Sequence, residues 1–418
     1  MWAYLLSITR IERSALLYVA AFSAVGFGHI GMVSVLGNLY VLGLGFDATF
    51  LGTLTATGQL VWALTALPAG EIGARFGLRG TMVTGYVLVA LLFAAYLNVP
   101  LLPREAWGAG LLITNLLMWA SVSLMSVNGV PYLMSIVPTE QRSTAFSFQA
   151  AVMPVMAFLG SLIGGFLPEF LRRVTGGELS DTGAYRVVLM LPAVVYFLSA
   201  GLLLKARPAP PLIQPSKEAA GQAAPLGLLV FLGVLFGLQI ASEATLTSFL
   251  NVYYNKDLLV STSVIGTIFA LVRLMPFFLS PLLPLAFNRW GSGLTMMASN
   301  ALLAVAAIGL ALFPNWIAAS VAFLLASVAS SVANPARSLL GQESVLPRWR
   351  TTVNAVTSIS LAMGGALAGY AGGRLIDLAG FRGLFLAGAG LALASVVMYA
   401  AGRRKTALQP AGAVGDVP

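Results

Sequence analysis

Residues 70–79 read Gly-Glu-Ile-Gly-Ala-Arg-Phe-Gly-Leu-Arg, a short charged stretch between two long apolar segments near 47–74 and 79–98. Its centre, Arg75-Phe-Gly77, returns as Arg289-Trp-Gly291, 214 positions further along the chain. Each copy follows one long apolar segment and precedes another. The sequence therefore predicts a protein built from two similar halves, each composed of long apolar helices.

The composition is that of a membrane protein. Of 418 residues, 58% are hydrophobic and 9% are charged, whereas a soluble domain carries about 25% charged residues. Apolar runs of about 20 residues, long enough to cross the hydrocarbon core as helices, recur along the chain. We expect an all-α polytopic membrane protein with about twelve transmembrane helices. The predicted helices lie near 13–42, 47–74, 79–98, 106–137, 142–171, 185–206, 226–255, 262–288, 293–313, 316–346, 350–378 and 381–403.

A Pro- and Ala-rich stretch at 207–225 predicts a flexible linker between the halves. The expected organisation is a six-helix bundle over 1–206, a second over 226–405, and a flexible tail over 406–418. Of the 23 Lys and Arg residues, 14 fall in one set of alternate loops and 7 in the other, and the richer set has the pattern of cytoplasmic loops. We therefore expect an integral protein of a bacterial inner (plasma) membrane, with both termini and the linker cytoplasmic.

Several kinds of chemistry lack the residues they need. The chain has no Cys and a single histidine, His29, so metal clusters and histidine-based catalysis have little material. It has no GxxxxGK[ST] sequence, which argues against ATP as a driver within this chain. The net charge of +9 is scattered over short loops and does not form a nucleic-acid patch. We predict no enzyme activity, catalytic residues, cofactor, metal or nucleic-acid partner.

Further matches support the internal repeat. Asn38-Leu-Tyr40 pairs with Asn251-Val-Tyr253 at a spacing of 213, and Leu51-Gly-Thr53 pairs with Ile265-Gly-Thr267 at 214. Parallel repeats related by an axis along the membrane normal are one way in which transporters build a site at the bilayer midplane. With its helix number, linker and repeat, the chain resembles the major facilitator superfamily over essentially its whole length.

The resemblance is most specific in the charged loop. Gly70, Arg75, Gly77 and Arg79 match the family's Gly-x-Leu-Ala-Asp-Arg-x-Gly-Arg-Lys. In the family this loop is a cytoplasmic gate latch, and the resemblance implies the same role here. The family's Asp falls on Ala74, and Glu71, one turn earlier, is a candidate for the missing carboxylate. The expected gate and motif residues are Gly70, Glu71, Arg75, Gly77, Arg79, Arg142 and Arg289.

Two charges lie in the middle of apolar segments. They are Glu243 in Gln239-Ile-Ala-Ser-Glu-Ala-Thr-Leu-Thr-Ser-Phe-Leu250 and Arg273 in Gly266-Thr-Ile-Phe-Ala-Leu-Val-Arg-Leu-Met-Pro-Phe-Phe278. A charge at this depth costs several kcal/mol unless it faces protein or water. One hypothesis is that Glu243 titrates while Arg273 binds an anionic or polar group. The alternative is a static ion pair that holds two helices together.

The repeat adds weaker counterparts to these charges. Arg273 aligns with Gln59, and Glu243 lies one position from the counterpart of His29. An imidazole titrates near neutral pH, so His29 is either a second proton-coupling group or a hydrogen-bonded packing residue. Arg337 is either a gate contact or a second cation in the cavity. The expected substrate-binding residues are Arg273, Gln59, Arg337, Asn115, Trp119, Asn38 and Asn251.

Glycines four residues apart mark helix faces that permit close packing. They occur at 160–165, where they partly match a glycine motif of proton-antiporting family members, and at 365–373. We interpret them first as packing faces and second as a hint of efflux. The GxGxxG match at 26–31 lies inside an apolar helix and is interpreted as packing.

The resemblance implies a secondary transporter that works by alternating access. The polar inventory favours a small polar or anionic organic solute and proton coupling, and we expect a monomer whose partners are that solute, protons and membrane lipid. The alternative is proton-coupled efflux of amphipathic or drug-like compounds, favoured by the glycine motif and by the many Met and Phe residues. A membrane receptor or scaffold without transport, and an intramembrane enzyme, are the other classes considered.

Overall fold

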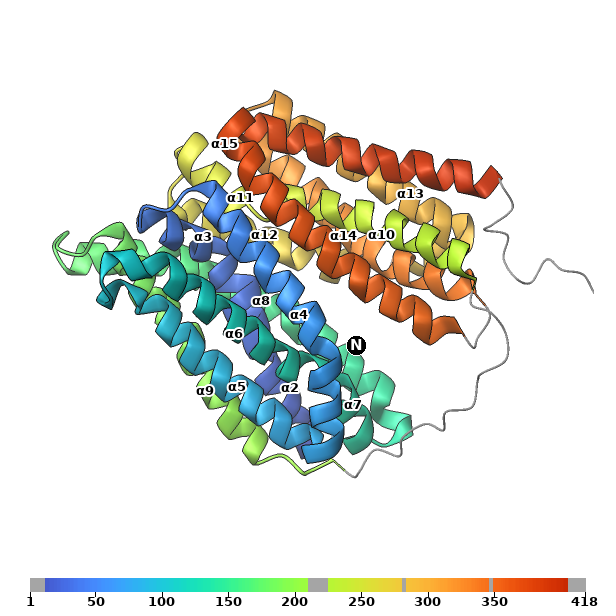
Figure 1. Ribbon diagram of the computed structural model, residues 1–418, viewed down its shortest axis with the longest axis horizontal. Coiled ribbons are helices and arrows are strands. Elements are labelled where there is room, and N and C mark those ends of the chain that lie inside the picture. The colour runs from blue at the N-terminus through green and yellow to red at the C-terminus, as the bar shows by residue number, and fades with distance from the viewer. Residues whose placement is uncertain (1–11, 210–224, 280–282, 346–348, 405–418) are drawn as a thin grey trace, which may run out of the picture. The chain divides into compact units, whose positions relative to one another are not determined.

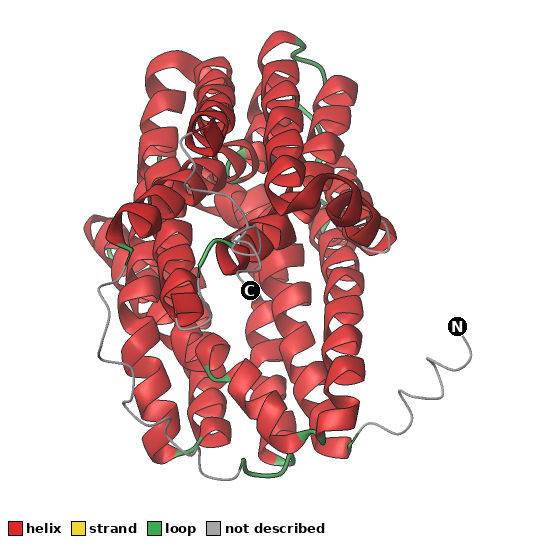
Figure 2. Ribbon diagram, turned by 90° about the vertical axis from the view of Figure 1, so that its right-hand side faces the viewer, coloured by secondary structure: helices red, strands yellow, loops and turns green. Residues whose placement is uncertain are grey.

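A computed structural model describes residues 12–209, 225–279, 283–345 and 349–404, and helices are the regular secondary structure there. Figures 1 and 2 show long helices joined by short loops, and these residues contain no strand. The first elements are α2 Arg13–Val25, the π-helix η1 Gly26–Val33, α3 Ser34–Gly43, α4 Ala48–Phe76, α5 Leu78–Leu97, the 3-10 helices η2 Val99–Leu101 and η3 Arg104–Ala106, α6 Trp107–Val127, α7 Gly129–Ile136, α8 Thr139–Val174 and α9 Asp181–Leu204. The remainder are α10 Leu226–Thr247, α11 Leu250–Val252, the π-helix η4 Tyr253–Asp257, α12 Thr262–Leu279, α13 Leu283–Leu312, α14 Trp316–Glu343 and α15 Arg350–Arg404.

The helices have the lengths and compositions of membrane-spanning segments. Among the described residues, ten helical segments are long and apolar enough to cross a bilayer, and 262–275 form a shorter apolar helix. One of the ten, Thr352–Gly402, is 51 residues long and is broken at Gly380, where φ is 67°. The all-α membrane fold is therefore confirmed, whereas the number twelve stays a prediction.

The chain forms two compact units, each of which takes a short segment from the other half of the sequence. Within the described residues, unit 1 contains 12–47, 57–209 and 254–274, and unit 2 contains 48–56, 225–253, 275–279, 283–345 and 349–404. Close packing of glycine faces explains why 254–274 belong to unit 1 and 48–56 to unit 2. A Cβ on Gly266 would lie 2.6 Å from the Cα of Gly165 in α8, and one on Gly373 would collide with the backbone carbonyl of Ala48 in α4. These helices pack backbone to backbone, as the interpretation of 160–165 and 365–373 requires.

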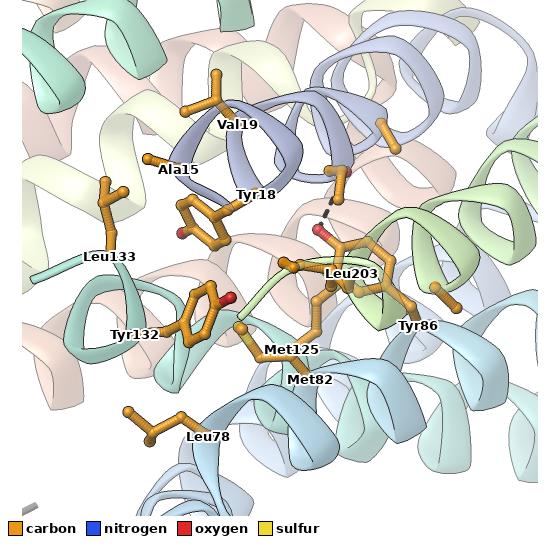
Figure 3. Close-up of a cluster of buried hydrophobic side chains, with 14 of the residues drawn as sticks. Ala15, Tyr18, Val19, Leu78, Met82, Tyr86, Met125, Tyr132, Leu133 and Leu203 are labelled. Carbon is orange, nitrogen blue, oxygen red and sulfur yellow. Dashed lines mark hydrogen bonds between the residues drawn. The ribbon is translucent and has the colours of Figure 1, made fainter. Parts of the chain in front are cut away.

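A cluster of tyrosines forms the core of unit 1 at one end of α2, α5, α7 and α9. The rings of Tyr18 and Tyr132 lie 5.7 Å apart, and the buried hydroxyl of Tyr86 donates a 3.2 Å hydrogen bond to the carbonyl of Ala21 (Figure 3). The Tyr132 hydroxyl donates to the carbonyl of Arg207 at 2.7 Å, so the phenols of Tyr86 and Tyr132 both keep a polar contact inside an apolar cluster. In unit 2, α10 packs against α15, α14 and α13 around fully buried side chains such as Phe236 and Met296.

The sequence repeat is also a structural repeat. The Tyr40 hydroxyl donates to the carbonyl of Leu97 at 2.7 Å, and the Tyr253 hydroxyl donates to that of Leu310 at 3.5 Å. Both members of the second pair lie 213 positions after their counterparts. The two loop glycines behave alike, since φ is 92° at Gly77 and 73° at Gly291. These left-handed conformations favour glycine because it has no Cβ.

A left-handed position in the repeat predicts a stabilising substitution. Gly45 has a φ of 92°, and Leu259, 214 positions later, has a φ of 53° and is 84% exposed. A left-handed conformation costs a non-glycine residue about 1–2 kcal/mol. Leu259→Gly should therefore raise the free energy of unfolding by up to about 1 kcal/mol, after subtracting the greater freedom of glycine in the unfolded chain. Leu259→Val should lower it, and equal thermal stability of the two variants would contradict this prediction.

Candidate functional site

The predicted site residues divide between the two units. Unit 1 holds His29, Asn38, Gln59, Asn115, Trp119 and Arg273, together with the motif-loop residues Gly70, Glu71, Arg75, Gly77, Arg79 and Arg142. Unit 2 holds Glu243, Asn251, Arg289 and Arg337. The two intramembrane charges that are prominent in the sequence therefore belong to different units, and each has its own surroundings.

His29 is accessible although it lies midway along the span Arg13–Gly43. It belongs to η1, and π-helical turns within α-helices are frequent at functional sites. The glycines on either side of it, Gly28 and Gly31, let α9 and α8 approach the η1 backbone. The imidazole meets the ring of Trp119 edge-on, with centroids 5.5 Å apart. The imidazole makes no hydrogen bond to another described residue, so its ring nitrogens are available to a proton or a ligand.

Arg273 lies in the neighbourhood of His29. Its guanidinium is within electrostatic range of the imidazole, and its buried Nε has no hydrogen-bond partner among the described residues. Arg273 follows Gly266 by two helical turns and so shares the face of α12 that packs on α8. Gln59 is half-buried on α4, next to Gly58, whose Cα lies against the Trp119 indole. Unit 1 therefore brings an imidazole, a guanidinium and an indole together.

Glu243 faces α14. Ser330, Asn334 and Arg337 follow one another at spacings of four and three residues, which places them on one side of that helix, toward the Glu243 carboxylate. Arg337 is only 9% exposed, and its Nη2 donates a 2.9 Å hydrogen bond to Oδ1 of Asn334. Its Nη1 is buried and has no partner in the described part of the chain. Unit 2 therefore places a carboxylate near a guanidinium that has one buried donor without a partner among the described residues.

The described residues contain three ion pairs, Arg172–Asp181, Arg173–Glu169 and Arg207–Glu12. Neither Glu243 nor Arg273 takes part in any of them. Within unit 2 the charged neighbour of Glu243 is Arg337, and the alternative of a static Glu243–Arg273 pair stays a prediction. Glu343, the third charged residue on α10 and α14, accepts a 2.5 Å hydrogen bond from Ser292.

Gln239 was not among the predicted residues. Its side chain is completely buried, and neither its amide oxygen nor its amide nitrogen has a hydrogen-bond partner among the described residues. It precedes Glu243 by four residues and so lies on the same face of α10. That spacing was visible in the sequence, but burial was not. An unsatisfied buried amide costs about 1–3 kcal/mol, which makes Gln239 a candidate contact for a ligand or an ordered water.

The three predicted asparagines differ in burial. Asn115 is 6% exposed and Asn251 is 2% exposed, and Oδ1 of Asn251 accepts the N–H of Val252 at 3.0 Å. That contact gives Asn251 a role in ordering the short helix α11. Asn38 is half-buried on α3. Their substrate-binding roles stay predictions.

The motif loop is a tight turn between α4 and α5. Gly77 occupies it with a positive φ, and Nη1 of Arg79 donates to the carbonyl of Ala206 at 2.6 Å. Arg142 works in the same way, donating from Nη2 to the carbonyl of Met134 at 3.1 Å. Both arginines satisfy carbonyls near helix ends and complement the negative end of the helix dipole.

The other members of the motif loop are open to solvent. Glu71 and Arg75 are exposed and form no hydrogen bond or ion pair within the described part of the chain. Arg289 is likewise exposed. Gly70 has room around it, since a Cβ added there would meet only Val127 of α6, at 3.6 Å. Whether Glu71 replaces the missing family carboxylate stays a prediction.

Comparison with known families fits these features. The family model described as Major Facilitator Superfamily matches residues 16–359 and 232–415. The chain belongs to the major facilitator superfamily. The predicted family and fold are thereby confirmed, and the protein is an integral membrane transporter of that superfamily.

Individual similarities are distant. The multidrug resistance protein MdtH of Enterobacter sp. (strain 638) is 24% identical over 343 residues, covering 79% of this chain and 78% of that protein. Among solved structures, a D-xylose-proton symporter superposes with a TM-score of 0.72 at 16% identity, over 94% of this chain and 97% of that one. A bacterial homologue of the human lysosomal transporter Spinster gives a TM-score of 0.70 at 15% identity, over 94% and 96%. These structural likenesses establish the fold alone.

Proposed function

We propose that this superfamily member is a secondary active transporter that moves a small polar or anionic organic solute by alternating access, coupled to protons. The observation that supports the solute class is the buried Nη1 of Arg337, which has no partner among the described residues. A guanidinium donor left unsatisfied inside protein is costly, and a carboxylate, phosphate or hydroxyl of a solute would satisfy it. The unpaired amide of Gln239 on α10 adds a donor and an acceptor.

Proton coupling rests on Glu243 and His29. Glu243 forms no ion pair within 4.0 Å in the described part of the chain, yet it lies in the field of Arg337. A solute anion that binds Arg337 would weaken its attraction for the carboxylate and so favour protonation of Glu243. Binding of solute and proton would then be linked within unit 2. His29 is the corresponding titratable group of unit 1. We also propose that the protein lies in a bacterial inner membrane.

Efflux of amphipathic or drug-like compounds is the second candidate. The specific observation in its favour is the similarity to a multidrug resistance protein. The chain also contains 14 Met and 23 Phe residues, whose adaptable side chains suit apolar ligands of varied shape. Such a transporter would bind lipophilic cations, which Arg337 and Arg273 would repel unless their charges are compensated.

Ligand-induced thermal shifts separate the two candidates. The purified protein is melted with gluconate or lactate and, separately, with tetraphenylphosphonium or ethidium. We expect the anions to raise the melting temperature and Arg337→Gln to weaken their binding about tenfold or more, since a hydrogen bond to a charged group contributes about 1.5–3 kcal/mol.

Arg374→Gln is the matched control, because it removes an arginine of unit 2 that stacks on Tyr370 at 4.6 Å, away from Glu243 and Arg337. The unliganded melting temperature of each variant reports whether it folds, and Arg337→Lys tests the charge alone. Stabilisation by the lipophilic cations, with no response to either anion, would overturn the anionic-solute proposal and favour drug efflux.

A further inference from the structure

An open groove of about 570 Å³ lies on unit 1 between α8 and α12. None of the residues that line it belongs to the candidate site described above. Three consecutive turns of α8 supply almost all of its lining, and α12 supplies one residue at its beginning. The lining residues are Ile163, Phe166, Leu167, Glu169, Phe170, Arg173 and Ser263.

The floor of the groove is apolar and accessible. Phe166 and Phe170 are 52% and 59% exposed, and their spacing of four residues places both rings on one face of α8. They lie near the end of the segment Thr144–Val174, whose length and apolar composition suit a membrane span. Large exposed apolar side chains on a membrane-spanning segment mark a membrane interaction surface. The surroundings of this floor are therefore lipid.

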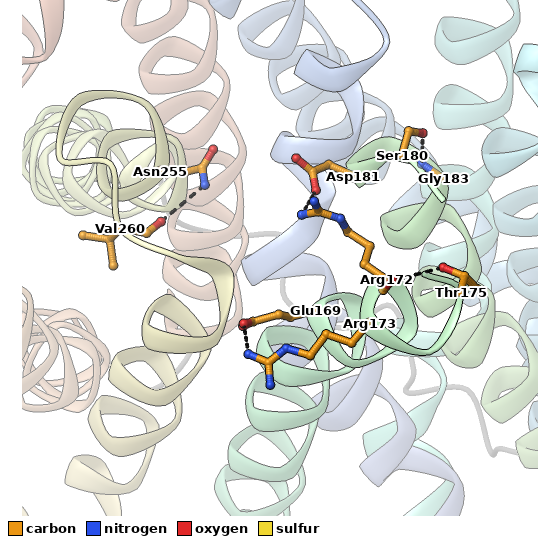
Figure 4. Close-up of polar contacts among 9 residues, drawn as sticks. All are labelled: Glu169, Arg172, Arg173, Thr175, Ser180, Asp181, Gly183, Asn255 and Val260. Carbon is orange, nitrogen blue, oxygen red and sulfur yellow. Dashed lines mark hydrogen bonds and ion pairs between the residues drawn. The ribbon is translucent and has the colours of Figure 1, made fainter. Parts of the chain in front are cut away.

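The rim of the groove carries one acid and one base. Nη2 of Arg173 lies 2.5 Å from Oε1 of Glu169, and both groups remain open to solvent (Figure 4). Ser263, in the first turn of α12, faces the same Glu169. The neighbouring Arg172 turns away and pairs with Asp181 at 2.5 Å (Figure 4). The rim of the groove is thus a neutral, dipolar pair.

We propose that this groove binds a zwitterionic phospholipid that has a primary ammonium, as in phosphatidylethanolamine. The acyl chains lie on Phe166 and Phe170, the phosphate accepts hydrogen bonds from Arg173, and the ammonium donates to Glu169. The phosphate of an anionic phospholipid would take Arg173 and leave the Glu169 carboxylate without a compensating cation. A choline headgroup has no N–H to donate. Charge complementarity therefore favours the primary ammonium over both.

Native mass spectrometry of the protein in detergent tests this assignment, with dioleoyl lipids that differ only in headgroup. We expect tighter binding of the ethanolamine lipid than of the choline or glycerol lipid. Arg173→Gln and Glu169→Gln should each weaken the ethanolamine lipid about tenfold, the effect of losing a charge-assisted hydrogen bond. Arg172→Gln is the matched control and should bind as the parent does.

Soluble phosphoethanolamine tests whether the groove binds the whole lipid or the headgroup alone. We expect it not to displace the lipid, because it lacks acyl chains. Phe170→Ala tests the apolar floor without touching a charge and should also weaken binding. Glycerol lipid binding as tightly as ethanolamine lipid would overturn the proposal. Equal binding by Arg173→Gln, Arg172→Gln and the parent, or full displacement by phosphoethanolamine, would do the same.

Discussion

Glu243→Gln is expected to abolish proton-driven accumulation of the solute while leaving solute exchange in place. A neutral amide keeps the shape of the side chain beside Ser330 and Asn334 of α14, but it cannot carry a proton. At a pH gradient of about one unit, one coupled proton supplies about 1.4 kcal/mol, or tenfold accumulation. We would measure uptake of the solute identified by the thermal-shift screen, in proteoliposomes with and without a pH gradient. The variant should lose the tenfold accumulation that the gradient drives.

The control for this experiment is Glu343→Gln, which removes a carboxylate from the same unit. Glu343 accepts a hydrogen bond from Ser292 and lies at the end of α14. We expect this variant to keep its response to the gradient. Equal accumulation by Glu243→Gln and the parent protein would exclude Glu243 as the coupling group and leave His29 to be tested in the same way.

Gly160→Ala is expected to be the most damaging of the single-methyl changes. A Cβ at Gly160 would collide with the carbonyl of Phe27 and would lie 3.1 Å from the Cα of Gly31. Both neighbours are backbone atoms of η1, so neither can rotate away, and the two helices must separate. Overpacking of this kind costs about 1–3 kcal/mol. The expected result is a lower melting temperature and a lower yield of folded protein in detergent.

Gly201→Ala is the matched change. Gly201 is an exposed helical glycine of α9 with nothing within 4 Å of the added Cβ. Alanine there should stabilise the helix by about 0.5–1 kcal/mol, because glycine loses more backbone freedom on folding. Equal melting of the two variants would show that the contact between Gly160 and Gly31 does not hold α8 against η1.

Much of the fold was predictable because lipid imposes a simple rule on sequence. Apolar runs must be long enough to cross the bilayer, and the turns between them need special residues. The glycines of Arg75-Phe-Gly77 and Arg289-Trp-Gly291 were recognisable for this reason, and both have a positive φ. The break at Gly380 inside α15 is also a turn of this kind.

For the candidate site, the sequence predicted individual residues but not which side chains lie beside them. Glu243, Arg273 and Arg337 were evident because a charge in an apolar segment is rare. Their neighbours were not evident, since Asn334 and Ser330 are ordinary residues until α14 turns them toward α10. Gln239 was overlooked because the sequence shows its spacing from Glu243 but not that both of its amide atoms are buried without partners among the described residues.

The sequence by itself determined the membrane class, the internal repeat, the family and which charges lie in apolar segments. These depend on local properties, namely run length, turn chemistry and the cost of a charge in lipid. Only the tertiary structure decided which groups lie together within a unit: Arg337 with Glu243 in unit 2, and His29 with Trp119 in unit 1. The reason is physical, because contacts between helices depend on how each helix is rotated and how closely glycine faces approach, and these are properties of the packed chain.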